Sequence, residues 1–324
     1  MPALRLVMMG TGPFAAPTFR ALYATRHLVA ALVTKPVRSA RAKDEPPASP
    51  LRAIAAEHGT PILDPVSINT PEAHEALRRL APDLFVVADY GQILSSETLR
   101  IARLGGVNLH GSLLPKYRGA APINWAIYRG ETETGVTVIH MTPDLDAGPC
   151  LAQAKVAIGP DETASELEPR LAELGAPLVC QAIDALQAGA ARAIPQDPAL
   201  VSKARRLRKT DGGIDWSRSA QQIRNQVRAF QPWPGSYTYW HRPNASPLRL
   251  IIGRAAVCPS LVAAEPGTVL EASGDRLIIV SGHDALNLEV IQPSGKRPMS
   301  TAEFLRGYHV EPGQRFGPET ARQA

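Results

Sequence analysis

An amide and an imidazole follow an apolar run in the stretch "NLHGSLLPKYRGAAPINW", residues 108–125. Asn108 and His110 are two residues apart, so on a strand they would lie on the same face. The amide can donate to an oxygen on which negative charge develops, and the imidazole can stabilise charge or move a proton. We interpret the pair as a set for chemistry at a carbonyl, in preference to a turn cap beside a buried, satisfied histidine.

A carboxylate is needed to orient His110, and the loop "TPDLDAGP", residues 142–149, offers two. Asp144 and Asp146 both stand in a sequence rich in glycine and proline. Asp is also common in such loops as a simple turn residue. Spacing alone does not choose between the two aspartates.

The elements that must position these side chains alternate along the first 190 residues. Continuous apolar runs predict buried strands, and segments of helical spacing separate them. This alternation predicts a Rossmann-like α/β fold, a mostly parallel sheet with helices on both faces. Ligands bind such sheets at the carboxyl ends of the strands, where Asn108 and His110 stand. We predict strands over 4–10, 28–34, 81–90, 105–111, 134–141 and 150–158, helices over 14–25 and 50–59, and a helical stretch over 163–189 interrupted at Pro169 and Pro177.

The pattern changes near residue 190. Residues 190–212 lack sustained periodicity, which is typical of a linker. An amphipathic helix over 219–230 follows, and then short alternating runs between turns, which predict a small OB-like β-barrel. We therefore expect a catalytic domain over 1–190, a basic linker over 191–208 and a C-terminal barrel domain over 209–324.

The segment "GTGPFA", residues 10–15, follows a strand and opens a helix, as a dinucleotide-binding loop does. It lacks the third glycine of that motif, Pro13 occupies the turn, and no acidic residue ends the second strand. These departures argue against a nicotinamide cofactor.

Charge is distributed unevenly over the 324 residues. Residues 200–324 hold 17 Lys and Arg against 10 Asp and Glu, a net of +7, whereas the whole chain carries +5. A basic half of this kind suggests a polyanionic partner. No run is long enough to span a membrane, and the first residues do not resemble a signal peptide. Together with three scattered cysteines, which predict no disulfide framework, this leads us to expect a cytoplasmic protein.

Several segments resemble folate-dependent formyltransferases: "NLHGSLLPKYRGAAPINWAI", "GETETGVT", "DLDAGP", and in the second half "GGIDWSRSAQQIRNQVRAFQPWPGSY". The match extends over nearly the whole chain and over both predicted domains. The resemblance implies 10-formyltetrahydrofolate as co-substrate, no metal, and a catalytic set of Asn108, His110 and Asp146. Asp146 is the aspartate that matches the family's L-D-x-G pattern. The resemblance also implies folate contacts at Ser112, Leu113, Leu114, Pro115, Asp89, Tyr90, Gly91, Ile93 and Leu94.

Over both halves the chain resembles the branch of this family that formylates methionine on initiator methionyl-tRNA for translation initiation. The resemblance then implies a tRNA-binding C-terminal domain, and we expect a monomer. The basic run "KARRLRK", residues 203–209, would be only a solvated linker without that resemblance. With it, tRNA contacts are expected at Arg38, Arg41, Lys43, Lys203, Arg205, Arg206, Arg208 and Lys209.

Two other functions compete with this interpretation. Formyltransferases acting on amino-sugar nucleotides share the Asn–His–Asp set, but the loop at 35–50 and the segment "IQPSGKRPMS" favour tRNA. Purine-pathway formyltransferases are smaller and lack a second domain. A catalytically idle nucleic-acid-binding module is disfavoured because Asn108, His110 and Asp146 are all present.

Overall fold

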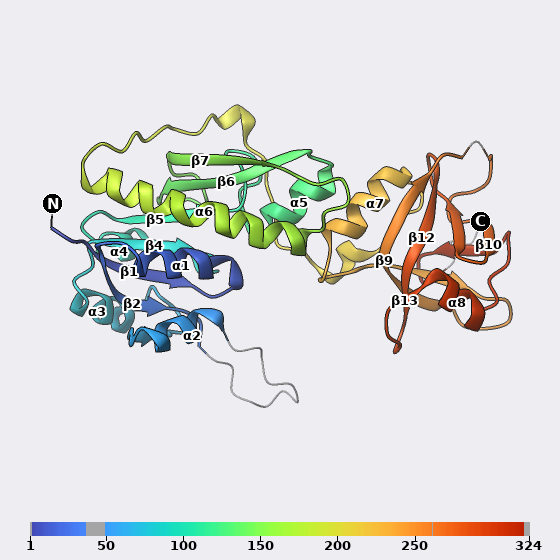
Figure 1. Ribbon diagram of the computed structural model, residues 1–324, viewed down its shortest axis with the longest axis horizontal. Helices are drawn as coiled ribbons and strands as arrows, with labels where there is room; N and C mark the ends of the chain where they lie inside the picture. The colour runs from blue at the N-terminus through green and yellow to red at the C-terminus, as the bar shows by residue number, and fades with distance from the viewer. Residues whose placement is uncertain (1, 37–48, 261, 321–324) are drawn as a thin grey trace. The chain divides into compact units, whose positions relative to one another are not determined.

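The computed structural model describes residues 2–36, 49–260 and 262–320. The chain forms two compact units. The first comprises residues 1–122, 133–157 and 166–205, and the second comprises residues 123–132, 158–165 and 206–324. Figure 1 shows the strands and helices of both units.

The first unit contains a seven-stranded sheet in the order β3-β2-β1-β4-β5-β6-β7. The neighbours from β3 to β5 are parallel, whereas β6 and β7 are antiparallel to the strands beside them. The prediction of a mostly parallel sheet is therefore confirmed. The strands are β1 (Arg5–Gly10), β2 (Leu28–Val33), β3 (Ile62–Leu63), β4 (Leu84–Ala88), β5 (Gly106–His110), β6 (Glu133–His140) and β7 (Cys150–Ala157).

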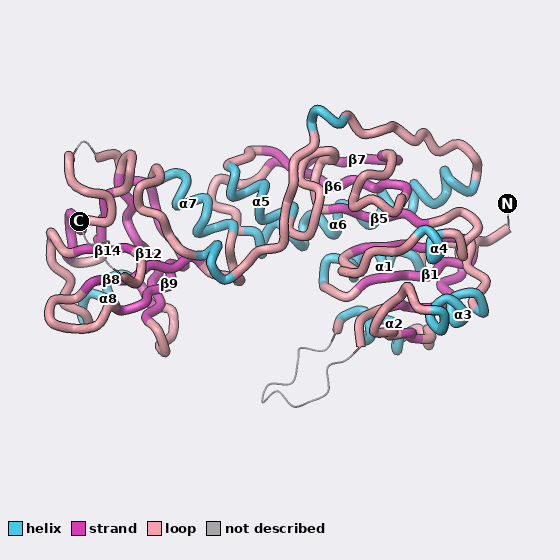
Figure 2. The backbone as a smooth tube through the Cα atoms, turned by 180° about the vertical axis from the view of Figure 1, so that it is seen from behind, coloured by secondary structure: helices cyan, strands magenta, loops and turns pink. Residues whose placement is uncertain are grey.

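Helices cover both faces of this sheet. α6 (Ala164–Gln187) lies on the face that presents Leu109, because a side chain at Gly175 would collide with the Leu109 side chain. α3 (Pro71–Arg79) and α4 (Ser96–Leu99) pack against the opposite face. In Figure 1 α1 (Ala16–Tyr23) and α6 lie in front of the sheet, and Figure 2, from behind, brings α4 to the front. Helix α2 (Pro50–Glu57) packs against α1.

The long helix α6 differs from the prediction. It runs without a break through Pro169 and Pro177, so the predicted interruptions are wrong. A proline inside a helix removes a backbone hydrogen bond and costs about 3 kcal/mol. The helix persists because its apolar side buries Leu167, Leu171 and Val179 almost completely. Tertiary packing thus outweighs the local preference to break.

The second unit is a closed antiparallel barrel. Its strands follow the order β10-β11-β12-β9-β8-β14, with β13 paired to β12. Backbone hydrogen bonds join β14 to the start of β10: Phe316 N donates to Gly267 O at 2.7 Å, and Val269 N to Gln314 O at 2.9 Å. The predicted small barrel is confirmed. Its strands are β8 (Ser236–His241), β9 (Leu248–Cys258), β10 (Val269–Ser273), β11 (Arg276–Val280), β12 (Ala285–Pro293), β13 (Met299–Ser300) and β14 (Arg315–Gly317).

Three helices accompany the barrel in the second unit. The predicted amphipathic helix is α7 (Ala220–Ala229), capped by Ser219, whose hydroxyl accepts from Gln222 N. α8 (Thr301–Gly307) buries Phe304 in the barrel core. Most of α5 (Pro122–Arg129) also belongs to this unit, where Tyr128 stacks on Phe230 with ring centroids 5.1 Å apart.

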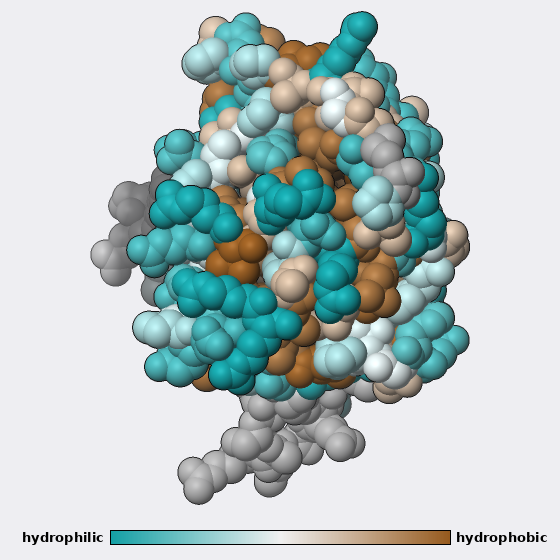
Figure 3. Space-filling model, turned by 90° about the vertical axis from the view of Figure 1, so that its left-hand side faces the viewer, coloured by the Kyte–Doolittle hydropathy of each residue, from teal (hydrophilic) through white to brown (hydrophobic). Residues whose placement is uncertain are grey.

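Apolar side chains reach the surface in separate patches between polar ones, as the face in Figure 3 shows. Val66, at 89% exposure, is the most exposed of the large apolar residues that the structure describes. No described helix has the length and apolar character that crossing a membrane requires.

The barrel closure depends on Gly267. Its φ is +93°, and a Cβ there would lie 2.2 Å from the Phe316 carbonyl oxygen that faces it. We predict that Gly267→Ala lowers the free energy of unfolding by roughly 2 kcal/mol or more, because it adds a clash to the backbone strain. The control is Gly274→Ala, since Gly274 has φ +59° and open space around it. Equal losses of stability in chemical denaturation for the two variants would contradict this account.

Candidate active site

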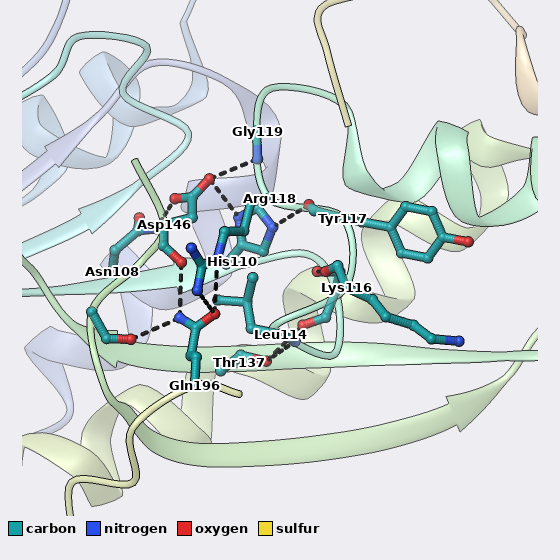
Figure 4. Close-up of polar contacts among 12 residues, drawn as sticks. Asn108, His110, Leu114, Lys116, Tyr117, Arg118, Gly119, Thr137, Asp146 and Gln196 are labelled. Carbon is teal, nitrogen blue, oxygen red and sulfur yellow. Dashed lines mark hydrogen bonds and ion pairs between the residues drawn. The ribbon is translucent and has the colours of Figure 1, made fainter. Parts of the chain in front are cut away.

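The side chains of Asn108 and His110 share one face at the end of β5. Leu109 between them points at α6, so its two neighbours point to the other side of the sheet. Asp146 comes from the loop that joins β6 to β7. Figure 4 shows the three side chains converging there.

The Asp146 carboxylate is the centre of the arrangement. Its Oδ1 accepts from Asn108 Nδ2 at 3.5 Å, and its Oδ2 lies 3.6 Å from His110 Nδ1. The same Oδ2 also accepts from the backbone N–H of Gly119 at 2.8 Å. Asp144 is exposed in the same loop. Of the two aspartates that spacing left open, Asp146 is the one that the fold brings to the histidine.

The histidine is held between two acceptors. His110 is 5% exposed, and its Nε2 lies 2.9 Å from the Tyr117 carbonyl oxygen. Its Nδ1 faces the Asp146 carboxylate. A neutral imidazole has a single N–H and can donate to only one of these groups, whereas an imidazolium donates to both. Both ring nitrogens of His110 thus face an acceptor.

Two residues that contact His110 have unusual backbone conformations. Tyr117 has φ +63° and Asp146 has φ +50°, in the left-handed region that few residues other than glycine adopt. Each such conformation costs on the order of 1–3 kcal/mol and persists only where the surroundings enforce it. Both loops that hold the ring thus carry a strained backbone position.

Hydrogen bonds fix the predicted folate segment, residues 112–115, to the neighbouring strands. Leu114 N donates to Thr137 Oγ1 at 3.0 Å, and Gln153 Nε2 donates to the Leu114 carbonyl at 2.7 Å. Ser112 is buried, and its hydroxyl donates to the Lys116 carbonyl at 2.7 Å. Ser112 and Leu114 therefore shape the loop from inside. The other two residues of the segment, Leu113 and Pro115, are half-buried.

The second predicted folate segment, at the end of β4, also consists of buried residues and more accessible ones. Tyr90 and Leu94 are buried in the core beneath α3 and α4. Asp89 and Gly91 are exposed and take positive φ values of 45° and 73°. Ile93 is 60% exposed. A ligand at this strand end would thus meet the Asp89 and Gly91 backbone and the Ile93 side chain.

A second pair of carboxylates lies beside this strand end. Although Asp89 as a residue is exposed, partial desolvation of its carboxyl raises the carboxyl pKa, and the positive charge of Lys35 partly offsets this. Burial also raises the pKa of Glu168 on α6, and the charge of Asp89 raises it further. The two acids thus disfavour each other's ionisation.

The predicted tRNA contacts fall into two groups. Arg38, Arg41 and Lys43 lie outside the described residues. In the run 203–209 the apolar residues Ala204 and Leu207 are buried. The basic side chains of this run are all exposed to solvent: Lys203, Arg205, Arg206, Arg208 and Lys209.

Sequence reasoning missed the role of Gly119. Its N–H binds Asp146, its φ is +124°, and a Cβ there would lie 2.5 Å from the Ala204 carbonyl oxygen. Only glycine lets the two chain segments approach so closely. The glycine in "KYRGAAP" was a visible signal, but its partners 27 and 85 residues away were not.

Comparison with known proteins shows the family to which the chain belongs. Residues 4–183 match the family model of formyl transferase, and residues 206–309 match that of the formyl transferase C-terminal domain. The chain therefore belongs to the formyl transferase family. Methionyl-tRNA formyltransferase of Geobacter sulfurreducens is 42% identical over 317 residues, covering 98% of both chains. The enzyme of that name from Rhodopirellula baltica is 44% identical over 326 residues, covering 97% of each.

A solved structure has the same fold. The N-formyltransferase of Helicobacter canadensis, in complex with folinic acid and dTDP-3-aminofucose, superposes with a TM-score of 0.64. The match covers 88% of this chain and 99% of that one, at 18% identity. At this identity the likeness concerns the fold alone.

The pair of carboxylates Asp89 and Glu168 leads to a prediction about how stability depends on pH. Because the folded-state pKa of Glu168 is raised, its contribution to stability is full below the ordinary carboxyl pKa and is lost as pH rises through the folded pKa. We predict that Glu168→Gln raises the melting temperature at pH 7, and that the gain shrinks as the pH falls through the folded-state pKa and is gone below the ordinary carboxyl pKa. Glu173→Gln, on an exposed position of the same helix, is the control. A stability at pH 7 equal to or below that of the wild type would refute the unfavourable Asp89–Glu168 interaction.

Proposed function

We propose that this protein transfers the formyl group of 10-formyltetrahydrofolate to the α-amine of methionine on initiator methionyl-tRNA. The products are formylmethionyl-tRNA and tetrahydrofolate. The observation that carries the chemistry is the contact of one carboxylate, Asp146, with both Asn108 and His110. The acceptor follows from full-length identities of 42% and 44% to methionyl-tRNA formyltransferases.

The reaction begins when the lone pair of the uncharged methionine amine attacks the formyl carbon. The carbonyl π electrons move to oxygen and give a tetrahedral oxyanion. Asn108 donates a hydrogen bond to that oxyanion, and positively charged His110 stabilises it. Asp146 holds the imidazole, and it accepts the proton that the attacking nitrogen loses, directly or through water. The intermediate then collapses: the oxyanion re-forms the carbonyl, the bond from the formyl carbon to N10 breaks, and N10 takes up the proton that Asp146 accepted, directly or through water, which regenerates the carboxylate.

The folate donor would occupy the strand ends beside this set. In support, the Helicobacter canadensis protein of the same fold is in complex with folinic acid. We propose that the Asp89 and Gly91 backbone and the side chain of Ile93 meet the pterin. Leu113 and Pro115 offer half-buried apolar surface after β5. Ser112, Leu114, Tyr90 and Leu94 would act from beneath by holding these two segments in shape.

The tRNA would be held mainly through its phosphates. The exposed basic run 203–209 and the net charge of +7 over residues 200–324 provide an attractive field. Phosphate contacts of this kind position a nucleic acid and contribute little to sequence choice. We propose that Arg38, Arg41 and Lys43 also contact the tRNA.

We further propose a catalytic domain over 1–190, a linker over 191–208 and a tRNA-binding barrel over 209–324. The protein would act in the cytoplasm as a monomer.

A formyltransferase acting on an amino-sugar nucleotide is the second candidate, because the Helicobacter canadensis structure holds dTDP-3-aminofucose. Its 18% identity supports the shared fold and no particular acceptor. The relatives near 42% identity over 98% of the chain favour tRNA.

The test offers each acceptor to the purified protein with 10-formyltetrahydrofolate and measures formylated product. We predict formylation of charged initiator tRNA and none of an amino-sugar nucleotide. Asn108→Ala should lower kcat by about 100- to 1000-fold, because it removes one donor to the oxyanion. Gln181→Ala, which removes an exposed amide on α6 outside both predicted folate segments, should leave kcat unchanged.

Two results would contradict the proposal. Formylation of the amino-sugar nucleotide alone would transfer the assignment to the second candidate. Near-full turnover by Asn108→Ala at saturating donor would remove Asn108 from the oxyanion site.

A further inference from the structure

The segment 194–204, part of the predicted linker, is bound to both loops of the active site. Ile194 exchanges two backbone hydrogen bonds with Cys150, where β7 begins just after the Asp146 loop. Further along, Arg118 N donates to the Ser202 carbonyl at 2.8 Å, and Ala204 N donates to the Arg118 carbonyl at 2.7 Å. We call this segment the strap.

Gln196 on the strap lies between the two loops. Its Nε2 donates to the carbonyl oxygens of Asp146 at 2.8 Å and of Gly148 at 2.7 Å. Its Oε1 accepts from Arg118 Nε at 3.0 Å and from Arg118 Nη2 at 2.8 Å. An amide group has two N–H donors and two acceptor lone pairs, so Gln196 uses its full capacity here. Figure 4 shows the amide between Arg118 and Asp146.

These contacts act on the strained part of the loop. Asp146 has φ +50°, a conformation that its own backbone disfavours. Gln196 fixes the carbonyl groups of Asp146 and of Gly148 two residues later, which sets the path of the loop. With the backbone fixed, the Asp146 carboxylate points at His110 and at the N–H of Gly119.

The other end of Gln196 acts on the loop after β5. Arg118 stands between Tyr117, whose carbonyl faces His110, and Gly119, whose N–H binds Asp146. Its guanidinium donates twice to Gln196, which fixes its direction as well as its distance. Gln196 therefore links the acceptor on one side of the imidazole to the carboxylate on the other.

We infer that Gln196 is a positioning residue for formyl transfer, which holds Asp146 in line with His110 by clamping the two loops together. This inference rests on the proposed function, because it assumes that Asp146 acts in the reaction. Gln196 itself has no role at the reacting atoms.

Gln196→Glu tests the clamp with little change in volume. The glutamate keeps an oxygen for Arg118, but its other oxygen replaces the two N–H donors and faces the Asp146 and Gly148 carbonyls as an acceptor. We expect kcat to fall by about 10- to 100-fold, as for a displacement of a catalytic group by about 1 Å, while KM for both substrates stays essentially unchanged. The control is Asp197→Ala: the Asp197 carboxylate accepts from Ala199 N within the strap, so this variant should not affect kcat. Wild-type kcat in Gln196→Glu would overturn the inference.

A double-mutant cycle separates positioning of Asp146 from a general structural role. In an Asp146→Ala background, adding Gln196→Glu should lower kcat little further, because the group that it positions is gone. A further fall as large as in the wild-type background would overturn the inference.

Hydrogen–deuterium exchange provides a readout that does not depend on activity. Peptides covering 142–149 should exchange faster in Gln196→Glu than in the wild type, and at the wild-type rate in Asp197→Ala. Unchanged exchange in Gln196→Glu would overturn the clamp even if kcat falls. If the wild-type protein formylates no methionyl-tRNA, the proposed function fails, while faster exchange would still support the clamp itself.

Discussion

The contact of the Asp146 carboxylate with three partners is the constraint on which the site depends. Asn108 and His110 reach it from β5, and the Gly119 N–H reaches it from the loop that follows. The Asp146 side chain is 11% exposed, and its contacts with several donors fix its direction. In the proposed reaction it orients the imidazole of His110.

The surrounding architecture holds this carboxylate in place. Asn108 and His110 lie at the carboxyl end of β5, where ligands bind sheets of this kind. The loop that joins the antiparallel strands β6 and β7 brings Asp146 to the same place. Left-handed conformations at Tyr117 and Asp146 turn both loops toward the ring. The strain that they store is offset by hydrogen bonds from segments distant in sequence, the strap 194–204 above all.

Much of this could be predicted from local patterns. Alternation along a strand placed Asn108 and His110 on one face, and apolar runs between turns predicted both the sheet and the barrel. The choice between Asp144 and Asp146 could not be made by spacing, because it depends on the path of the loop and on partners distant in sequence. The unbroken path of α6 through Pro169 was missed because burial of distant side chains outweighs local propensity. For the strap the sequence predicts only a linker with a basic end that includes Lys203, because backbone contacts leave no periodic pattern.

The central claim is that the charge of Asp146 acts on His110 during formyl transfer. Its most direct measurement is the single-turnover rate of methionyl-tRNA formylation by Asp146→Asn, with Asp144→Asn as the control from the same loop. The amide keeps an oxygen for the Gly119 N–H but lacks the charge. The account predicts a rate at least about 100-fold below the wild type for Asp146→Asn, of the size found for lost electrostatic stabilisation, and an unchanged rate for Asp144→Asn. A wild-type rate in Asp146→Asn would contradict it.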